Sequence, residues 1–564
     1  MKATKIKQGN GWLLSAGVIL LAAALQAAAT VPTPAEEAGY KEYSQHEAVA
    51  RFLSRVAAAA PEAKVQVVGR TKDVREYPSQ DLYLVILTEE GAAIPEQFNA
   101  AKPTVLITAA QHGNEQSAKE AALAVIRDLA LGELKPLLKK VNVLVMPQTN
   151  PYGNFFDRRT NELDLDMNRD HVKLETEGVA AIHRVFHEWL PEVTIDAHEK
   201  GDDYYRVSIG CVSNINVDAK FQEFSRATLL ADVDQALAKK NIAFHEYLVT
   251  EEMGINTSAG AAIRPEDLRN REMMKRYSTT DINDGRNSLG IYQTLSFIQE
   301  CASRHDVQTL AARTRWQYAG LRSFLESVVR HGVEVKSMVR DTRQAVLAAA
   351  RQHVYLKMDY ARDPKQPEIS LKKFENADST ILGVLKAEKK AGEAVSEEDL
   401  AEYPWPDKVK VVSDVVKNWF PLVEGRLCLY RPLGYIIPAA NRSVVETLLR
   451  HGLAVQTFTQ DIGLEEEVYL ASDVVPAKYD YLPPEVLKVG KKTMSAVVKT
   501  GDFYVACAQP GAALIPCLLE PQSDFGFIRY QSFKLVPEKG GYFAIARYNG
   551  QASLPIILYK NFRR

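Results

Sequence analysis

His112 and Glu115 are three positions apart and follow a short apolar run at residues 104–110. Neutral imidazole and carboxylate groups are good zinc ligands, and a catalytic zinc site keeps three protein ligands and an open position for water. A turn at a strand's end, followed by the start of a helix, can bring positions i and i+3 to one ion. Such a pair often arises by chance, so it is weak evidence for a metal site when taken alone.

Two more polar residues follow apolar runs farther along the chain. His198 comes after residues 192–197, and Glu300 comes after residues 294–299. Ligands in open α/β sheets bind beyond the carboxyl ends of strands, so these segments deliver polar groups where such a fold builds its sites. A histidine at the end of a second strand supports a zinc site considerably.

At this point the sequence resembles the zinc carboxypeptidase family, the class that includes carboxypeptidase A. The H-G-N-E at 112–115 is similar to the family's first two ligands, and His198 in I-D-A-H fits the third. N-P-Y-G at 150–153, R-T-N at 159–161 and D-L-D-M-N-R at 164–169 look like the family's N-P-x-G, R-x-N and D-x-N-R blocks. Glu300 in S-F-I-Q-E fits the catalytic glutamate. The resemblance spans about residues 60–330.

The resemblance implies the chemistry of the site. His112, Glu115 and His198 would bind one Zn²⁺, which leaves a position open for water. Glu300 would take a proton from that water and pass it to the leaving amine. Arg159 would polarise the scissile carbonyl and stabilise the developing oxyanion.

The resemblance also implies how the substrate is held. Asn168 and Arg169 would bind a free C-terminal carboxylate, the arginine through paired hydrogen bonds. Asp166 would orient His112 by fixing its tautomer. The family's substrate-capping tyrosine has no clear match: Tyr277 and Tyr292 are candidates, and we favour Tyr277. Arg286 could reach the specificity pocket and favour an acidic side chain, although a structural role is also open.

Neighbouring polar residues have simpler interpretations. In an extended strand, Glu199 and Cys301 would point away from the face that carries His198 and Glu300, so neither should bind the metal. His183 and His187 are expected to be an exposed helical pair, and a hydrogen-bonded loop histidine is expected at 171. The five cysteines have no spacing that proves a disulfide.

Alternating strand-like and helix-like segments must position these residues. Near-continuous apolar strands between amphipathic helices predict an α/β domain, a carboxypeptidase-like mixed sheet covered by helices on both faces. The strand candidates are 65–69, 81–88, 104–110, 141–147, 192–197 and 292–299, and the helix candidates are 119–134 and 178–190.

The residues after 306 have a different pattern of predicted elements. Residues 306–357 read as long helices, 386–407 as a charged linker, and the segment after 408 as short strands split by Gly and Pro. We therefore predict a signal peptide at 1–29, a catalytic domain at 30–335, a helical segment and linker at 336–407, and a smaller β-rich C-terminal domain at 408–564.

Composition and the first residues bear on location. The 564 residues are 46% hydrophobic and 25% charged, with a net charge of −2, which is typical of a globular protein and gives no attraction to nucleic acid. Lys2, Lys5 and Lys7 precede an apolar run and an A-x-A site at 27–29, as in a secretory signal peptide. We expect a periplasmic or secreted protein with no membrane contact after cleavage; the alternative is an N-terminal anchor.

These observations favour a zinc metallocarboxypeptidase acting on exported or periplasmic peptides. A cell-wall peptide amidase or endopeptidase, cutting γ-D-glutamyl-diaminopimelate links, would use the same chemistry on another bond. Deacylases such as aspartoacylase also use H-x-x-E and a distant histidine, but the leader and the chain length disfavour them. A metal-free, non-catalytic peptide-binding protein on the same scaffold is the remaining alternative.

Overall fold

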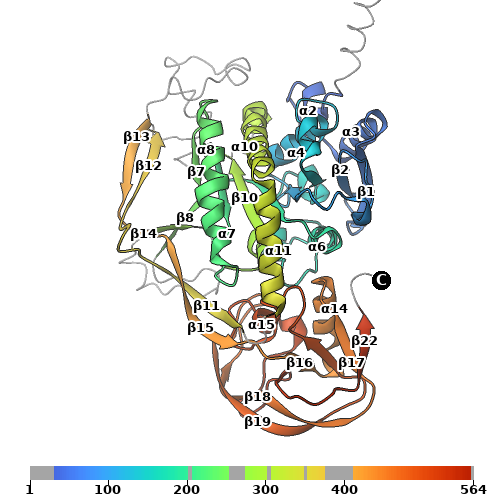
Figure 1. Cartoon of the computed structure of the whole chain (residues 1–564), viewed down its shortest axis with the longest axis vertical. Helices are drawn as coiled ribbons and strands as arrows, with labels where there is room; N and C mark the ends of the chain where they lie inside the picture. The colour runs from blue at the N-terminus through green and yellow to red at the C-terminus, as the bar shows by residue number, and fades with distance from the viewer. Residues whose placement is uncertain are drawn as a thin grey trace, which may run out of the picture.

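The computed structural model describes residues 31–200, 206–252, 273–277, 279–301, 307–348, 352–374 and 411–560. The predicted leader at 1–29 and the charged stretch at 386–407 lie outside the described residues. Figure 1 shows the chain in two parts, with the elements up to α10 above and most of the C-terminal strands below.

A mixed sheet forms the framework of the upper part. Over the described residues it has eight strands in the order β1-β2-β4-β3-β5-β10-β6-β7. The central strands β4, β3, β5 and β10 are parallel to one another, whereas β1 and β2 pair antiparallel with their neighbours. Strand β6 pairs antiparallel with β10 and parallel with β7. The strands are β1 (Ala63–Arg70), β2 (Asp81–Leu87), β3 (Thr104–Ala109), β4 (Asn142–Met146), β5 (Val193–Glu199), β6 (Val207–Cys211), β7 (Phe244–Glu246) and β10 (Leu295–Cys301).

Alternation along the strands sends side chains into two separate cores. On β2, Val85 packs into one core, while Leu84 and Ile86 pack into the other. The first core lies under α3 (His46–Ala59), α4 (Gln116–Ala130), α8 (Ala231–Ala238) and α10 (Leu310–Arg330).

The second face of the sheet is covered by helices and by the C-terminal region. Here α6 (Glu177–Trp189) and α9 (Gly285–Gly290) share one core with side chains such as Leu448 and Ile515. The predicted fold class, a mixed sheet covered on both faces with a β-rich C-terminal part, is therefore confirmed. Much of the second cover comes from the C-terminal region, which the sequence did not indicate.

The predicted helical stretch at 306–357 is too long. Helices α10 and α11 (Gly332–Ala348) end by Ala348, and β11 (His353–Ala361) follows. In β11 the buried residues Val354, Leu356 and Met358 alternate with more exposed ones, which is the period of a strand. This strand pairs antiparallel with β15 (Leu422–Tyr430).

The C-terminal region, residues 411–560 as described, forms a second sheet. Its order is β19-β18-β21-β16-β20-β17-β22. Strand β12 pairs with β13 in a separate two-stranded sheet, and β14 pairs with β9, which also pairs with β8. The β14–β9 pairing ties the C-terminal region to the upper part. The strands are β8 (Leu248–Glu252), β9 (Met273–Tyr277), β12 (Ile369–Phe374), β13 (Val411–Val416), β14 (Trp419–Phe420), β16 (Gly434–Ile437), β17 (Val455–Phe458), β18 (Ile462–Val475), β19 (Val486–Val498), β20 (Phe503–Ala506), β21 (Ala546–Tyr548) and β22 (Ile556–Lys560). The remaining helices are α2 (Pro34–Glu37), α5 (Pro151–Phe155), α7 (Ala219–Phe224), α14 (Arg442–Arg450) and α15 (Leu514–Leu519).

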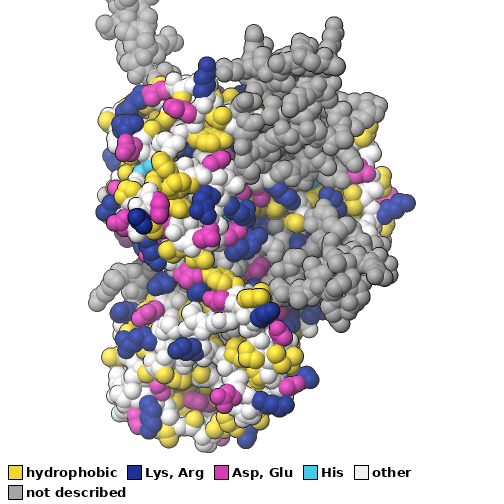
Figure 2. Space-filling model, turned by 180° about the vertical axis from the view of Figure 1, so that it is seen from behind, with side chains coloured by type: hydrophobic (Ala, Val, Ile, Leu, Met, Phe, Trp, Pro, Cys, Tyr) yellow, Lys and Arg dark blue, Asp and Glu magenta, His cyan; other side chains and the backbone are white. Residues whose placement is uncertain are grey.

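Three general properties of the described residues concern surface charge, membrane-spanning helices and the cysteines. Figure 2 shows basic and acidic side chains interspersed on one face, without a broad field of one sign. Within the described residues, no helix has the length and apolar character needed to cross a bilayer. All five cysteines are free thiols, so no disulfide stabilises the fold.

Candidate metal centre and active site

Three predicted ligands meet at the carboxyl edge of the main sheet. His112 follows β3, Glu115 precedes the first turn of α4, and His198 lies in β5. Their potential ligand atoms all lie within 4.8 Å of one another, and all three side chains are buried. Glu115 Oε1 is 2.7 Å from His112 Nδ1, and its Oε2 is 2.7 Å from His198 Nδ1.

The outer nitrogens of both histidines are held by carboxylates. His112 Nε2 is 3.0 Å from Asp166 Oδ1, and His198 Nε2 is 2.5 Å from Asp196 Oδ2. With these acceptors taking the protons on Nε2, the two Nδ1 atoms, 3.1 Å apart, can offer lone pairs to a cation. Two imidazole nitrogens and the Glu115 carboxylate that converge in this way form a set that fits Zn²⁺.

The local backbone explains why the ligand loop keeps this shape. Ala110, at the end of β3, has φ +60°, a left-handed conformation that turns the chain into the loop. A Cβ atom added at Gly113 would lie 2.0 Å from the carbonyl carbon of Gly153 in α5. The loop and α5 therefore approach so closely that only glycine fits at 113.

Glu300 lies beside the ligands because of strand register. Strand β10 runs parallel to β5, and Glu300 is paired with His198. Its Oε2 is buried and has no hydrogen-bond partner among the described residues. Burial raises the pKa of Glu300 to about 7; the charge of His198 opposes this rise, and that of Glu115 adds to it.

Arg159 and Asp166 lie on the open side of the cluster. Arg159 Nε donates to Asp166 Oδ2 at 2.9 Å, and its Nη1 is 3.6 Å from Glu115 Oε1. The net effect of the surroundings is to lower the pKa of Asp166 below its ordinary value. Burial alone would raise this pKa, but the hydrogen bond from His112 and the nearby positive charges outweigh the burial.

Asn168 and Arg169 follow on the same loop and differ in exposure. Asn168 is buried: its Oδ1 accepts from Gly285 N at 2.9 Å, and its Nδ2 is 3.3 Å from His198 Nε2. Arg169 is exposed, and its Nη1 donates to the Asn168 carbonyl at 2.6 Å. Arg169 is thus the better placed of the two to meet a substrate carboxylate.

The structure also shows positioning residues that sequence reasoning missed. Asp196 accepts hydrogen bonds from Thr108 Oγ1 at 2.7 Å and from Gln111 Nε2 at 2.6 Å, besides that from His198. Gln111 Oε1 in turn accepts from His171 Nε2 at 2.9 Å. Asp196 and His198 are two positions apart in one strand, so they share a face; this spacing was the available signal.

The tyrosine positions differ from the expectation. Tyr277 packs on Trp419, with ring centroids 4.9 Å apart, and under the Arg226 guanidinium at 4.0 Å. Tyr292 is buried and donates to the His451 carbonyl at 2.7 Å. Tyr247 instead faces the site: burial raises its pKa well above the ordinary value, and a hydrogen bond to Glu300 adds to the rise.

Arg286 is buried beside this region. Its Nη2 donates to the Thr279 carbonyl at 3.0 Å and lies 3.3 Å from Asp284 Oδ2. Its Nε and Nη1 have no hydrogen-bond partner among the described residues. The guanidinium lies behind Asp284, which itself lines the pocket next to the site.

The other polar candidates fall outside the metal's surroundings. Glu199 forms a buried ion pair with Arg313 at 2.5 Å, and Cys301 lies 3.6 Å from the carbonyl of the same arginine, so both point away as expected. The expectation of an exposed pair at His183 and His187 is wrong. Both are buried because the C-terminal region covers this face of α6.

Comparison with known proteins agrees with this geometry. Residues 49–207, which contain all three ligands, match the sequence pattern of the zinc carboxypeptidase family. This segment is a zinc carboxypeptidase domain.

Similar carboxypeptidases extend over more of the chain's length. Carboxypeptidase 2 of Trichophyton tonsurans is 22% identical over 486 residues, which cover 80% of each chain. Probable carboxypeptidase 2 of Trichophyton verrucosum is 24% identical over 472 residues, 78% of this chain and 81% of that one. Among solved structures, carboxypeptidase A of Helicoverpa armigera is 14% identical and covers 56% of this chain and 80% of its own, with a TM-score of 0.39.

Proposed function

We propose that this zinc carboxypeptidase hydrolyses the C-terminal peptide bond of exported or periplasmic peptides, with Glu300 as general base and acid. The family and the carboxypeptidase relatives support the metallocarboxypeptidase activity. The observation that carries the finer proposal is the buried Glu300 carboxyl, which lies in register with the ligand His198 and has one oxygen without a partner among the described residues.

Each residue has one task in the reaction. His112, Glu115 and His198 would hold Zn²⁺, which would supply a Lewis acid that lowers the pKa of water and polarises the substrate carbonyl. Glu300 Oε2 accepts the proton of the attacking water and returns it to the leaving amine nitrogen. Its burial suits both steps, because a carboxyl with a pKa of about 7 can accept and release a proton near neutral pH.

The arginines on the open side of the cluster bind the negatively charged groups of the substrate. Arg159, held by Asp166, donates to the oxyanion that develops on the scissile carbonyl. Arg169 binds the terminal carboxylate, and Asn168 fixes the loop that carries it through its bond with Gly285 N. Recognition of that carboxylate makes the enzyme an exopeptidase. Export rests on the leader-like sequence at 1–29.

The test is a Glu300→Gln variant with a zinc assay. The variant should retain about one zinc per chain and lose about 10²–10⁴-fold in kcat on blocked dipeptides, because the amide keeps the shape and removes the base. Glu188→Gln, an exposed glutamate on α6, is the matched control. Full activity in Glu300→Gln would contradict the assignment. Bound zinc without release from any linear peptide in the wild type would favour cell-wall peptides instead.

A further inference from the structure

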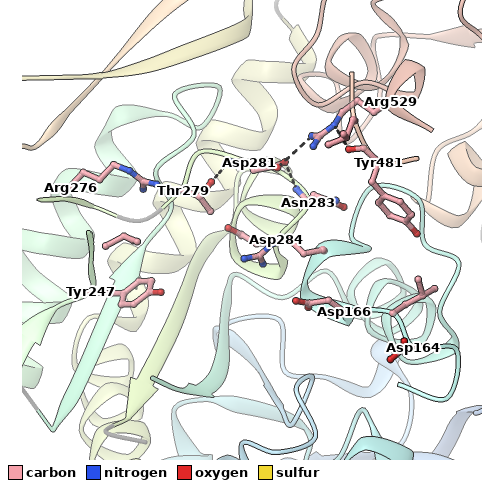
Figure 3. Close-up of a pocket in the computed structure, with 14 residues that line it drawn as sticks. Asp164, Asp166, Tyr247, Arg276, Thr279, Asp281, Asn283, Asp284, Tyr481 and Arg529 are labelled. Atoms are coloured by element: carbon pink, nitrogen blue, oxygen red, sulfur yellow. Dashed lines mark hydrogen bonds and ion pairs between the residues drawn. The ribbon is translucent and has the colours of Figure 1, made fainter. Parts of the chain in front are cut away.

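A pocket of about 530 Å³ adjoins the proposed active site. Its lining includes Asp166, which bonds to the ligand His112, and also Arg169 and Tyr247. The loop from Thr279 to Asp284 lines another side (Figure 3). If Arg169 holds the terminal carboxylate, the side chain of the same substrate residue must enter this pocket. The pocket therefore decides which C-terminal residue is accepted.

Part of the pocket wall comes from a distant part of the chain. Tyr481, Leu482 and Arg529, all from the C-terminal region, line the pocket. Tyr481 and Arg529 lie across it from Arg276 and Tyr247 (Figure 3). The C-terminal region is thus a component of the binding site and does more than stabilise the fold.

This wall is fixed in place by contacts across the two parts. Arg529 Nη1 lies 3.5 Å from Asp281 Oδ2, and its Nε donates to the Tyr481 carbonyl at 3.3 Å. The Tyr481 hydroxyl is hydrogen-bonded to Glu175, and Lys173 Nζ lies over the Tyr481 ring at 4.9 Å. A wall tied down in this way can exclude a side chain by shape.

The chemistry of the lining indicates what the pocket takes. Each of its four aspartates lies within 4 Å of an arginine: Asp281 of Arg529, Asp284 of Arg286, Asp166 of Arg159 and Asp164 of Arg158. Arg276, which also lines the pocket, donates to the Tyr277 carbonyl. Among the described residues, the lining therefore offers no unpaired carboxylate to a basic side chain. The uncharged surface comes from aromatic and aliphatic side chains, namely Leu165, Tyr247, Val249, Tyr481 and Leu482.

We propose that the C-terminal region sets the specificity of the enzyme, with Leu482 and Tyr481 forming a wall that admits large aromatic or aliphatic C-terminal residues. This inference rests on the proposed carboxypeptidase function. Seven of the fourteen lining residues are charged and five are aromatic or aliphatic, so the apolar wall is the part of the pocket that can accept an uncharged side chain.

The experiment changes the side chain at Leu482, to Trp or to Ala, and compares three substrates. We measure kcat/KM for blocked dipeptides ending in Phe, in Ala and in Trp. Leu482→Trp should lower the Phe/Ala ratio at least tenfold, mainly through KM. Leu482→Ala should raise the acceptance of Trp-ended relative to Phe-ended substrate severalfold. Leu433→Trp is the matched control, because Leu433 is exposed in the same region and does not line the pocket.

An unchanged Phe/Ala ratio in both Leu482 variants, or an equal fall for both substrates, would overturn the inference. Binding of the same peptides to a Glu300→Gln background separates this inference from the proposed function. Selective loss of Phe-ended peptide binding in Leu482→Trp supports the wall even if the wild type hydrolyses neither peptide. Hydrolysis with no change in selectivity rejects the wall and keeps the carboxypeptidase.

Discussion

The metal ligand His198 is held from behind by a chain of buried side chains. Asp196 accepts from His198 and Gln111, and Gln111 accepts from His171. Burial lowers the pKa of His171 to about 3, so this histidine is neutral and donates through Nε2. Its remaining nitrogen, Nδ1, lies 3.1 Å from His183 Nε2. Each hydrogen bond from His171 through Gln111 to Asp196 therefore has a fixed donor and a fixed acceptor.

This arrangement predicts that His171 contributes to zinc affinity without touching the metal. In His171→Phe, Gln111 loses its donor and can turn away from Asp196, so we expect the zinc dissociation constant to rise about 10–100-fold. Chelator competition measures it, and the absorption spectrum of the Co²⁺-loaded protein reports the altered ligand field. His353→Phe is the control, because His353 is an exposed residue of β11. Unchanged zinc affinity and an unchanged spectrum would show that the hydrogen bonds from His171 have no effect on His198.

Sequence predicted the residues that stand in compact motifs and missed those that depend on folding. The three ligands follow apolar runs, and the structure brings them together as expected. Tyr247 escaped notice because its approach to Glu300 depends on how β7 and β8 pack, and no local spacing reports that. His183 and His187 looked exposed because the helix period shows an amphipathic face but not a second cover.

At the scale of elements, the ligand loop and α5 are locked together at one glycine. Gly113→Ala would place a methyl group against the Gly153 backbone, so loop or helix must shift. We expect a loss of about 1–3 kcal/mol in unfolding free energy and a large loss of zinc binding. Thermal unfolding and zinc content measure these effects.

The control for this prediction is Gly463→Ala in β18, where an added Cβ meets nothing within 4 Å. It should leave zinc content unchanged and alter stability by less than about 1 kcal/mol. Equal behaviour of the two alanine variants would mean that the close approach at Gly113 does not hold the loop.

Strands outside the main sheet were harder to predict than its central strands. The apolar runs of the central parallel strands gave a clear signal because both faces are buried. Strand β11 was read as helix because it continues a segment with few helix breakers, and its alternation is short. Its partner β15 lies far along the chain, and such pairing is invisible to local periodicity.

At the scale of the molecule, a group of buried histidines lies where α6 meets the C-terminal region. Burial lowers the pKa of His171 and His187 to about 3 and that of His451 to about 4, from an ordinary 6.5. His183 is lowered well below its ordinary value as well. The folded protein therefore binds fewer protons than the unfolded chain between about pH 4 and 6.5.

These histidines should consequently lower stability on acidification through this window. Their contribution is complete above pH 6.5 and is lost at up to about 1.4 kcal/mol per pH unit for each histidine as the pH decreases. Buried carboxyls whose pKa is raised, among them Asp170 to about 6 and Glu300 to about 7, act in the opposite direction. The histidine share is therefore measured by denaturant unfolding of the wild type and of His187→Leu between pH 7 and 4, and the variant should lose less stability on acidification. Equal slopes in the two proteins would contradict the prediction.

The shared core also predicts that the catalytic part does not fold alone. Ending the chain at residue 407 removes the side chains that pack with Leu84, Ile86 and Phe186 and leaves a wide apolar face in water. We expect the truncated protein to aggregate, as size-exclusion chromatography would show. A monomeric truncated protein with a cooperative thermal transition would contradict this expectation.

The pairing of β5 with β10 has a consequence for the order of events during folding. His198 and Glu300 are neighbours in register, yet about one hundred residues separate them along the chain. Closing so long a loop costs conformational entropy, and contacts local in sequence do not offset it. This pairing is therefore expected in the slow, late part of folding. His112 and Glu115, by contrast, are neighbours as soon as the first turn of α4 forms. A newly made chain therefore acquires its hydrolytic competence in one late step, and partly folded forms carry ligands but no working peptidase.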